Sequence, residues 1–459
     1  MLLRIIHKEM LSHILTLRFG VTLVLFIVLV FASIFVSVNE YMRNKADYDA
    51  QVRTSRQRLD ELAKETDLRD RYRRLVREGR IDPVPVAELS WLAQGLQPYW
   101  PLTFLTSPRG TSGIERGANR NPVLGLLRVP DFVYVVSVVL SLLAILFMFD
   151  AVCGEKETGT LRLMLANATP RHTVLLGKWL GGYVLLIVPF LVSAAAGVGY
   201  VWVRGALQPG SEQFLRIAAL MLVACLYIAV FFNLSLFIST ATHRSPTALL
   251  LCVIVWVGFI LVIPNMAPIT AKIIRPMPPS RVLIAEKRAV EEEFMLKRQQ
   301  LALTGALSYG QTTQQAQEQL QKEFDREIRR LEQYFERLQT SQFELSSTLA
   351  RLSPCAQWTF AAVNLTNTGM RAYQRVEQAR QQLLTQFDQF RDTYYRRWRE
   401  SRNGDPPEFS VDELPSLRVA LPTFADALNS SLNDVLILTI LNVLFFMLAF
   451  VFFLRYDVT

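Results

Sequence analysis

The chain has 459 residues, of which 51% are hydrophobic, and its formal net charge is +9 at pH 7. The apolar residues are gathered into long blocks, which is typical of a membrane protein and excludes an ordinary soluble domain. The excess of basic residues is spread along polar stretches and forms no compact basic face with aromatic residues, so the composition also excludes a nucleic-acid-binding protein.

The first predicted element is an amphipathic helix over residues 1–19. Apolar side chains line one face of this helix: Leu3, Ile6, Met10, Ile14 and Leu17. Polar and basic side chains fall on another face: Arg4, Lys8, Ser12 and Thr16. Because a basic amphipathic helix buries its apolar side at the headgroup boundary, we expect it to lie flat on the inner leaflet. The alternative is a helix that extends the first span into the cytosol.

Six apolar blocks are each long enough to cross a bilayer core of about 30 Å. We expect transmembrane helices over residues 20–38, 132–150, 179–203, 214–240, 247–264 and 433–454. No small-residue cleavage pattern follows the first block, so it should remain as an anchor. An even number of crossings puts both termini on one side, and the Lys and Arg bias of the short loops places that side in the cytoplasm.

Residues 39–131 form a polar insert on the extracytoplasmic side in this topology. A weak apolar periodicity from Tyr48 to Leu62 predicts a helix that ends by Gly79. An irregular, glycine-containing connector follows. The aromatic residues of the two inserts fit either the headgroup level of the membrane or the core of an extracytoplasmic domain. They are Tyr99, Trp100, Phe104, Trp358 and Phe360.

Residues 151–178 link the second and third blocks and must therefore lie at one membrane face. The segment contains, in order, two acidic residues, a Gly-Thr-Leu turn, spaced leucines and a Pro-Arg pair, and it ends on a Gly-Lys pair that enters the next block. These residues are Glu155, Glu157, Gly159, Thr160, Leu161, Leu163, Leu165, Pro170, Arg171, Gly177 and Lys178.

The second insert, residues 265–432, is also predicted to be helical and hairpin-like, because two apolar stripes recur at helical spacing. One stripe consists of Leu320, Phe324, Ile328, Leu331, Phe335 and Leu338. The other consists of Leu383, Phe387, Phe390, Tyr394 and Trp398. Stripes of this kind are buried in folded proteins, so we expect them to pack on each other or on a second subunit.

The chain offers little chemistry of its own. It has no phosphate-binding loop, since Trp179 follows Gly177-Lys178, and the four histidines are far apart in the sequence, so we predict neither a catalytic nor a metal site. Asp150 and Asp434 lie at the ends of spans, while the interior polar residues are neutral groups such as Asn233, which we expect to hydrogen-bond between helices. This sparse charge favours an external energy source over an ion-driven cycle.

Taken together, residues 151–178, the six blocks and the N-terminal helix resemble a type-2 ABC transporter permease. The large inserts resemble the subgroup that is related to copper-site maturation and gliding-motility permeases. The resemblance implies an all-α integral membrane protein with six transmembrane helices, an N-terminal amphipathic interfacial helix and a large helical extracytoplasmic domain made from two inserts.

By that resemblance the chain is expected to be the permease subunit of an ATP-driven exporter in the bacterial inner membrane, with cytoplasmic N and C termini. It is expected to be no enzyme and to hold no cofactor, because ATP and Mg would bind to a cytosolic ABC ATPase dimer. A second permease subunit, identical or a similar paralogue, would complete the assembly. Membrane lipid and a periplasmic protein are further expected partners. The alternative is a mechanotransmission or scaffold protein that acts on an extracytoplasmic partner without a substrate crossing.

The resemblance also assigns roles to residues. Residues 151–178 would be the coupling segment that docks in a cleft of the ATPase. Glu155 and Glu157 would face basic groups there, within a motif that includes Gly159 and Thr160. The apolar contact would come from Leu161, Leu163 and Leu165, unless these pack on the chain's own helices. Pro170 and Arg171 would end the coupling helix, and Arg4, Lys8 and Glu9 would belong to the interfacial helix.

Overall fold

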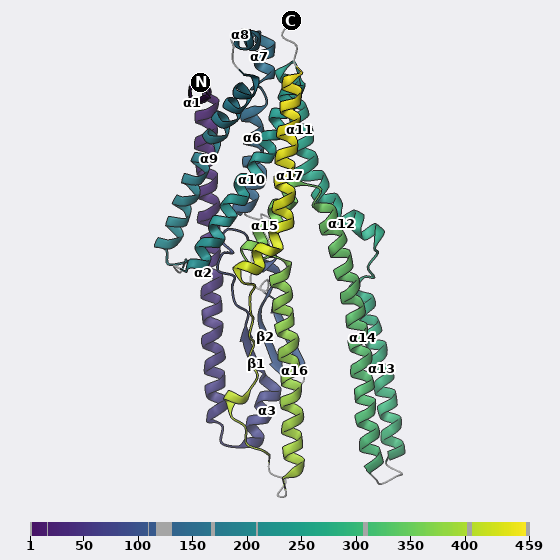
Figure 1. Cartoon of the computed structure of the whole chain (residues 1–459). Coiled ribbons are helices and arrows are strands. Elements are labelled where there is room, and N and C mark those ends of the chain that lie inside the picture. The colour runs from purple at the N-terminus through teal and green to yellow at the C-terminus, as the bar shows by residue number, and fades with distance from the viewer. Residues whose placement is uncertain are drawn as a thin grey trace. The chain divides into compact units, whose positions relative to one another are not determined.

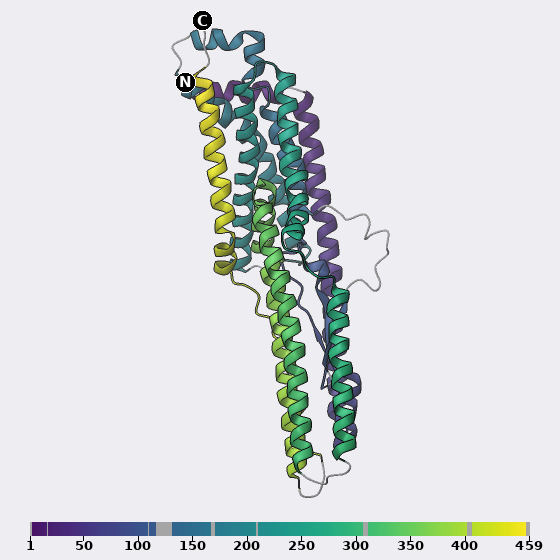
Figure 2. The same ribbon diagram turned by 90° about the vertical axis from the view of Figure 1, so that its right-hand side faces the viewer.

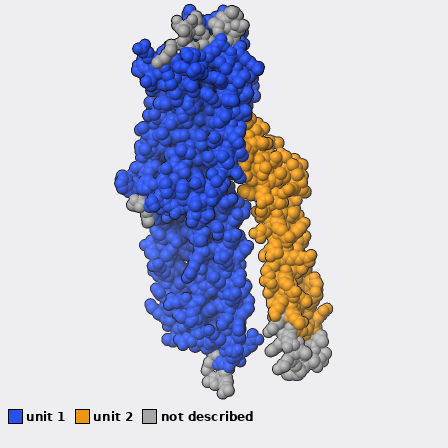
Figure 3. Space-filling model, viewed as in Figure 1, with its two compact units in different colours: residues 1–256, 357–459 blue, residues 257–356 orange. Residues whose placement is uncertain are grey.

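The computed structural model describes residues 2–15, 17–108, 110–115, 131–166, 170–207, 210–305, 311–401 and 406–455. The chain divides into two compact units (Figure 3). Unit 1 comprises residues 1–256 and 357–459, and unit 2 comprises residues 257–356. Helices dominate both units, which confirms the predicted all-α class of membrane protein.

Among the described residues, six helical segments are long and apolar enough to cross a membrane. They are Phe26–Lys64, Phe132–Thr158, Arg171–Val203, Ser211–Ala241, Ser245–Ile274 and Phe424–Leu454. Their number agrees with the six blocks that the sequence predicts.

The N-terminal helix α1 (Leu2–Ile14) ends before α2 (Leu17–Lys64) begins. Figure 2 shows α1 lying across the end of the helical bundle, crosswise to α2, so α1 is a separate helix and not a straight extension of the first span. The 48 residues of α2 form one continuous helix. At 1.5 Å per residue its length is about 72 Å, more than twice a bilayer core of about 30 Å, so α2 continues into the first insert.

The first insert contains a small sheet that the periodicity did not predict. After α3 (Leu68–Glu78), Gly79 adopts a φ of 67° and turns the chain into β1 (Arg80–Pro83). A short turn, η1 (Gln97–Tyr99), leads into β2 (Pro101–Ser107) and β3 (Gly110–Glu115). The strands are antiparallel in the order β1-β2-β3, with Ile81 paired to Leu105 and Phe104 to Gly113.

The bundle of unit 1 is built around α10 (Ser211–Ala241), which packs against α17 (Phe424–Leu454) and α6 (Ser141–Met148). The other bundle elements are α5 (Phe132–Val135), the π-turn η2 (Val136–Leu140), α9 (Arg171–Val203) and α11 (Ser245–Val257). Buried polar groups are satisfied inside it: the Tyr227 hydroxyl donates to the Ser137 carbonyl at 2.7 Å, and Trp358 Nε1 donates to the Val133 carbonyl at 3.2 Å.

The first insert shares two hydrophobic clusters with α16 (Met370–Glu400) and with the segment after α16, which contains the turn η4 (Val411–Glu413). The first cluster, called the aromatic cluster below, consists of Leu62, Tyr72, Leu75, Tyr394, Phe409 and Leu414. The second consists of Val84, Trp100, Phe104, Ala372 and Val376. Tyr394, Phe390 and Trp398 of the apolar stripe of α16 therefore pack on the first insert.

Burial decides between the two interpretations for three of the five aromatic residues. Trp100, Phe104 and Trp358 are almost fully buried, so they belong to the core of the chain. Tyr99 is 65% exposed and lies outside both clusters. Trp358 belongs to α15 (Pro354–Leu365) and stacks on Tyr227 of α10.

In unit 2, η3 (Gly258–Val262) and α12 (Ile263–Ile274) lead into the long helices α13 (Ser280–Gly305) and α14 (Gln311–Ala350). Phe294 of α13 and Phe324 of α14 have ring centroids 4.5 Å apart, so the stripe of α14 faces its neighbour α13. Lys287 and Glu332 add an ion pair between the two helices at 2.5 Å.

The helix α1 and the C-terminal end of α17 lie on the same side of unit 1 as the short helices α7 (Cys153–Thr158) and α8 (Thr160–Ala166) (Figure 1). We call this side the terminal end. The small sheet and α3 lie at the opposite side of unit 1, which we call the insert end.

Candidate functional site

The candidate site is the pair of short helices α7 and α8 at the terminal end. Gly159 ends α7 with a φ of 74°, a left-handed conformation that glycine adopts without strain. The Oγ1 atoms of Thr158 and Thr160 lie 2.9 Å apart across this turn. The Gly-Thr pair of the sequence motif therefore stops one helix and lets the next begin in a new direction.

A buried ion cluster, called the Lys178 cluster below, ties α7 to two other helices. Lys178 of α9 donates to Glu155 Oε1 of α7 at 2.7 Å and to Glu9 Oε1 of α1 at 3.0 Å. The side chain of Lys178 is only 2% exposed, and those of Glu9 and Glu155 are 10% and 19% exposed. Because two carboxylates share one ammonium group away from water, each depends on the lysine for its stability. The positions of α1, α7 and α9 are linked as a result.

Two glycines bring α1 close enough to α9 for this cluster to form. A Cβ atom on Gly177 would lie 2.6 Å from Ile5 Cγ2, and one on Gly181 would lie 3.0 Å from Glu9 Cβ. Glycines four residues apart let two helices approach closely in a membrane. Gly177 and Lys178, the Gly-Lys pair of the sequence motif, thus form part of the surface of α9 on which α1 packs.

The remaining charges of α7 cap the ends of neighbouring helices. Lys156 Nζ donates to the Thr240 carbonyl and, at 3.1 Å, to the Thr242 carbonyl, both at the C-terminal end of α10. Glu157 Oε2 accepts from the backbone N–H of Ser245, the first residue of α11, at 3.1 Å. A cation at a helix C-terminus and an anion at an N-terminus both complement the helix dipole. The helix α7 is therefore anchored to the turn between α10 and α11.

Serine and arginine side chains complete these attachments. Ser239 Oγ of α10 accepts hydrogen bonds from the backbone N–H groups of Val152 at 3.0 Å and Cys153 at 3.1 Å. Pro170 is the N-cap of α9, and Arg171, its first residue, donates through Nη1 to the Leu454 carbonyl at 2.6 Å. Arg171 thus caps the C-terminal end of α17.

The predicted leucines of the segment differ in their environment. Leu161 is fully buried, so its side chain packs on the chain's own helices. Leu163 is 73% exposed, and the side chain of Leu165 lies outside the described residues. Of the predicted apolar contact surface, Leu163 is the member that the structure shows at the surface.

The predicted residues of the N-terminal helix also differ in their environment. Arg4 and Lys8 are exposed, whereas Glu9 belongs to the Lys178 cluster. Leu3 and Ile14 of the predicted apolar stripe are 80% and 47% exposed and are available to lipid. The roles of Lys178 and Lys156 were not predicted from the sequence. The signal that could have identified Lys178 was a lone lysine at the start of an apolar block, since such a residue needs a carboxylate partner.

A second polar junction lies further inside the bundle. Trp179 Nε1 of α9 donates to Asn233 Oδ1 of α10 at 2.5 Å, and Asn233 Nδ2 donates to Asn442 Oδ1 of α17 at 2.8 Å. Asn442 Nδ2 in turn donates to the Leu226 carbonyl at 2.9 Å. The prediction that Asn233 hydrogen-bonds between helices is confirmed, and the junction holds α9, α10 and α17 in register.

The charged groups of α7 connect it to several helices. Within the described ranges, no group of three or more His, Cys, Asp or Glu side chains is placed to hold a metal ion. The charged groups of α7 bond directly to α9, to α11 and to the C-terminal end of α10, and they reach α1 through Lys178.

Comparison with known proteins adds the family. The family model described as ABC-2 family transporter protein matches residues 3–458, which confirms the resemblance to type-2 ABC permeases. The chain is similar to the probable ABC transporter permease protein NosY of Pseudomonas aeruginosa, with 32% identity over 117 residues, 24% of this chain and 40% of that protein. It is also similar to the probable ABC transporter permease protein NosY of Stutzerimonas stutzeri, with 27% identity over 151 residues, 32% of this chain and 54% of that protein. The matches thus span about half of these relatives.

Proposed function

This chain belongs to the ABC-2 family of transporter proteins, and from that premise we propose that it is the membrane-spanning permease subunit of an ATP-driven exporter in the bacterial inner membrane. ATP and Mg bind in a separate cytosolic ABC ATPase dimer. A second permease subunit, identical or paralogous, completes the assembly. Both termini, α7 and α8 face the cytoplasm in this proposal.

The observation that carries the proposal is the attachment of α7 to the ends of other helices. Through the Lys178 cluster α7 holds α1 and α9, and through Lys156 and Glu157 it holds α10 and α11. When ATP closes the ATPase dimer, the two coupling segments move and the packing of the bundle shifts to a second state. Leu163, which is 73% exposed, supplies an apolar contact to the ATPase.

Charge reversal of Glu157 tests this coupling. The Glu157→Lys variant places a cation at the N-terminus of α11, where the helix dipole disfavours it, and removes the negative charge offered to the ATPase. We expect normal amounts of the variant in the membrane fraction, and a loss of the difference in ATP hydrolysis between the full complex and the isolated ATPase. The matched control is Asp60→Lys, the same charge change at an exposed position of the insert end. Unchanged coupling in Glu157→Lys would contradict the proposal.

A second candidate function is mechanical transmission to an extracytoplasmic partner without transport. The observation that favours it is the continuous 48-residue helix α2, which joins the membrane bundle to the aromatic cluster through Leu62. A hydrogen-bonded helix of this length moves as one body, so a shift at the terminal end reaches the insert end.

The two candidate functions differ in whether a substrate crosses the membrane when ATP is supplied. Vesicles that contain the full complex are given ATP, and their content of lipid, peptide and dye is followed. At the same time, spin labels on α2 and α16 report movement at the insert end. Flux that depends on ATP supports the exporter, whereas label movement without any flux supports mechanical transmission.

A further inference from the structure

A hollow of about 460 Å³ lies at the insert end of unit 1, where the first turns of α10 meet both inserts. Its volume falls within the range of small-molecule sites. Seven polar residues contribute to its wall: Glu88, Glu212, Gln213, Arg216, Thr366, Asn367 and Thr423. The proposed coupling mechanism makes no use of this hollow.

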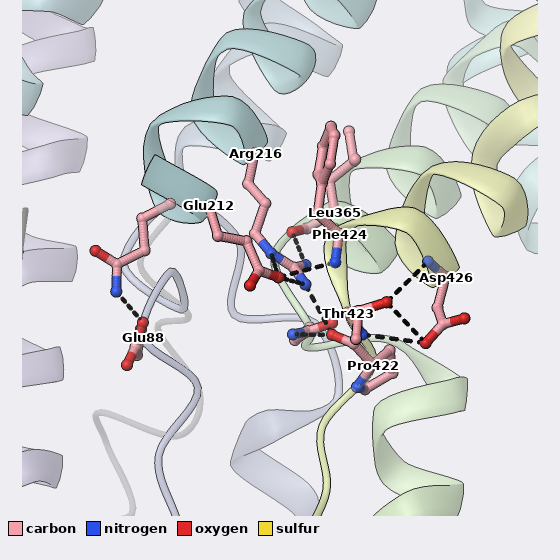
Figure 4. Close-up of polar contacts among 10 residues, drawn as sticks. Glu88, Glu212, Arg216, Leu365, Pro422, Thr423, Phe424 and Asp426 are labelled. Atoms are coloured by element: carbon pink, nitrogen blue, oxygen red, sulfur yellow. Dashed lines mark hydrogen bonds and ion pairs between the residues drawn. The ribbon is translucent and has the colours of Figure 1, made fainter. Parts of the chain in front are cut away.

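The side-chain hydrogen-bond donors of this wall are engaged within the protein, as Figure 4 shows for Arg216. Arg216 is 5% exposed, and all three of its guanidinium nitrogens donate: Nε and Nη2 to Glu212 Oε1, Nη1 to the Leu365 carbonyl, and Nη2 also to the Pro422 carbonyl. Asn367 Nδ2 donates to the same Pro422 carbonyl at 3.1 Å.

The other side-chain donors are engaged in the same way. Thr423 Oγ1 donates to Asp426 Oδ2 at 3.0 Å, Thr366 Oγ1 donates to the Ala362 carbonyl at 2.9 Å, and Gln213 Nε2 donates to Glu88 Oε2. A ligand that needs side-chain hydrogen-bond donors from the wall would have to break these bonds first.

Two acceptors, in contrast, are unpaired. The side-chain oxygens of Gln213 and Asn367 have almost no surface open to water and accept no hydrogen bond, which is rare for such atoms in folded proteins. The Glu88 side chain is exposed. The wall contains the carboxylates of Glu88 and Glu212 and one guanidinium, that of Arg216, so it carries one negative charge in excess.

We propose that this hollow binds a primary ammonium group. Such a group brings one positive charge and three N–H donors, which match the excess carboxylate. A small rotation of the Gln213 or Asn367 side chain would open its unpaired amide oxygen to the same group. The apolar side chains of Val86, Leu89 and Leu421 line the same hollow and would contact an alkyl chain on the amine. Two sources carry this chemistry: a soluble alkylamine, and the ethanolamine headgroup of a membrane lipid.

Binding to the full-length chain in detergent, without ATP or ATPase, tests the proposal independently of the exporter function. The probe is 1,4-diaminobutane, followed by titration calorimetry, and its fully N-methylated analogue, which has no N–H donor, is the control ligand. We expect the diamine to bind and the methylated analogue to bind at least about tenfold more weakly, because charge-assisted hydrogen bonds are lost.

Three variants locate the site. Glu88→Gln keeps the shape of the side chain but removes its charge, so affinity should fall by about tenfold. Gln213→Lys places an ammonium group of the chain itself beside Glu88 and should abolish binding. Glu408→Gln, at an exposed carboxylate outside the hollow, should leave affinity unchanged. Equal affinities for the diamine and its methylated analogue, or equal losses in Glu88→Gln and Glu408→Gln, would overturn the proposal.

The source of the amine is tested in lipid nanodiscs. Native mass spectrometry compares retention of phosphatidylethanolamine with that of phosphatidylcholine, whose quaternary headgroup has no N–H donor. Retention of the ethanolamine lipid that Glu88→Gln abolishes identifies a headgroup site, and diamine binding without such retention identifies a soluble amine. If the wild-type chain binds neither the diamine nor the ethanolamine lipid, the proposal fails while the exporter function stands untouched.

Discussion

At the terminal end of unit 1, charged side chains join the ends of several helices, whereas at the insert end aromatic rings pack into a closed cluster. The first set of contacts depends on single atoms, such as Lys178 Nζ at 2.7 Å from Glu155 and 3.0 Å from Glu9. The second depends on area: the rings of Tyr72 and Tyr394 stack with centroids 4.1 Å apart, and Phe409 meets Tyr394 edge-on at 5.8 Å.

This difference indicates which end of unit 1 can change from one set of contacts to another. A buried ammonium group shared by two carboxylates can exchange partners when a helix shifts by a few ångströms, because each bond is separate and directional. A packed aromatic cluster has no such second arrangement close by, since interiors resist deformation. We therefore expect the terminal end to change its contacts and the insert end to move as one body.

Loss of the shared ammonium group should have the largest effect. The Lys178→Met variant leaves Glu9 and Glu155 facing each other without a cation, and removal of one partner from a buried ion pair costs about 3–5 kcal/mol. We expect a lower temperature of unfolding and release of α1, measured as protease cleavage after α1. Adding Glu155→Gln to Lys178→Met should recover part of the loss. A Lys178→Met variant as stable as the wild type would show that the terminal end is not held by this cluster.

Truncation in the aromatic cluster should act on the other end alone. Phe409 is 2% exposed, and Phe409→Ala removes its ring from Tyr72 and Tyr394, at a cost of about 3 kcal/mol. We expect faster hydrogen exchange in α3 and the C-terminal part of α16, with no change in α7. The control is Tyr99→Ala, which removes a ring that is 65% exposed. Equal exchange changes at both ends would contradict the division between them.

A small change on α9 should sharpen the comparison. Gly177→Ala puts a Cβ atom 2.6 Å from Ile5 Cγ2, and this overpacking should cost about 2 kcal/mol as α1 is displaced. The matched control lies on the same helix: a Cβ atom on Gly199 meets nothing within 4 Å, so Gly199→Ala should be neutral or slightly stabilising. The unfolding temperatures of the two variants give the measurement. If the two unfolding temperatures shift by the same amount, α1 does not pack on α9 through Gly177.

The sequence predicted much of the fold because lipid imposes a simple rule. Twenty or so consecutive apolar residues mark each span, and the second insert has helical stripes that are easy to read. The sheet of the first insert escaped prediction because its strands are short and β3 contains Gly110 and Gly113, which read as a connector. The apolar stripe of α16 was recognised, but periodicity cannot say that its partners, Leu62 and Tyr72, lie more than 300 residues away.

The candidate site shows the same division. Its place followed from a charged segment between two apolar blocks. The partners of its charged residues could not be predicted from the sequence, because Glu157 bonds to Ser245, 88 residues away, and Glu155 bonds to Lys178 on the next span. Leu161 and Leu163 look alike in the sequence, yet one is buried and the other is 73% exposed, since two residues apart on α8 they lie on nearly opposite faces of the helix.

The smallest predicted effect is a pH dependence of the insert end. Burial raises the pKa of the Asp82 carboxyl, although Arg80 at 3.1 Å and the Leu417 N–H at 3.2 Å act in the opposite direction. The folded state then binds this proton more tightly than the unfolded state. The group therefore contributes stability that is complete below the unfolded pKa of about 3.9 and is lost as pH rises through the raised folded pKa.

Replacement of Asp82 by asparagine removes this titration and sharpens the comparison, because the Lys178 cluster at the terminal end is unchanged. For Asp82→Asn, we expect the unfolding temperature of the insert end to vary less between about pH 4 and about pH 7 than in the wild type. The control, Asp60→Asn, alters an exposed carboxylate of α2 and should keep the wild-type profile. Identical profiles for Asp82→Asn and the wild type would mean that the burial of Asp82 has no effect on stability. The hydrogen bond from the Leu417 N–H to Asp82 of β1 would then be as easily broken as the ion pairs at the terminal end.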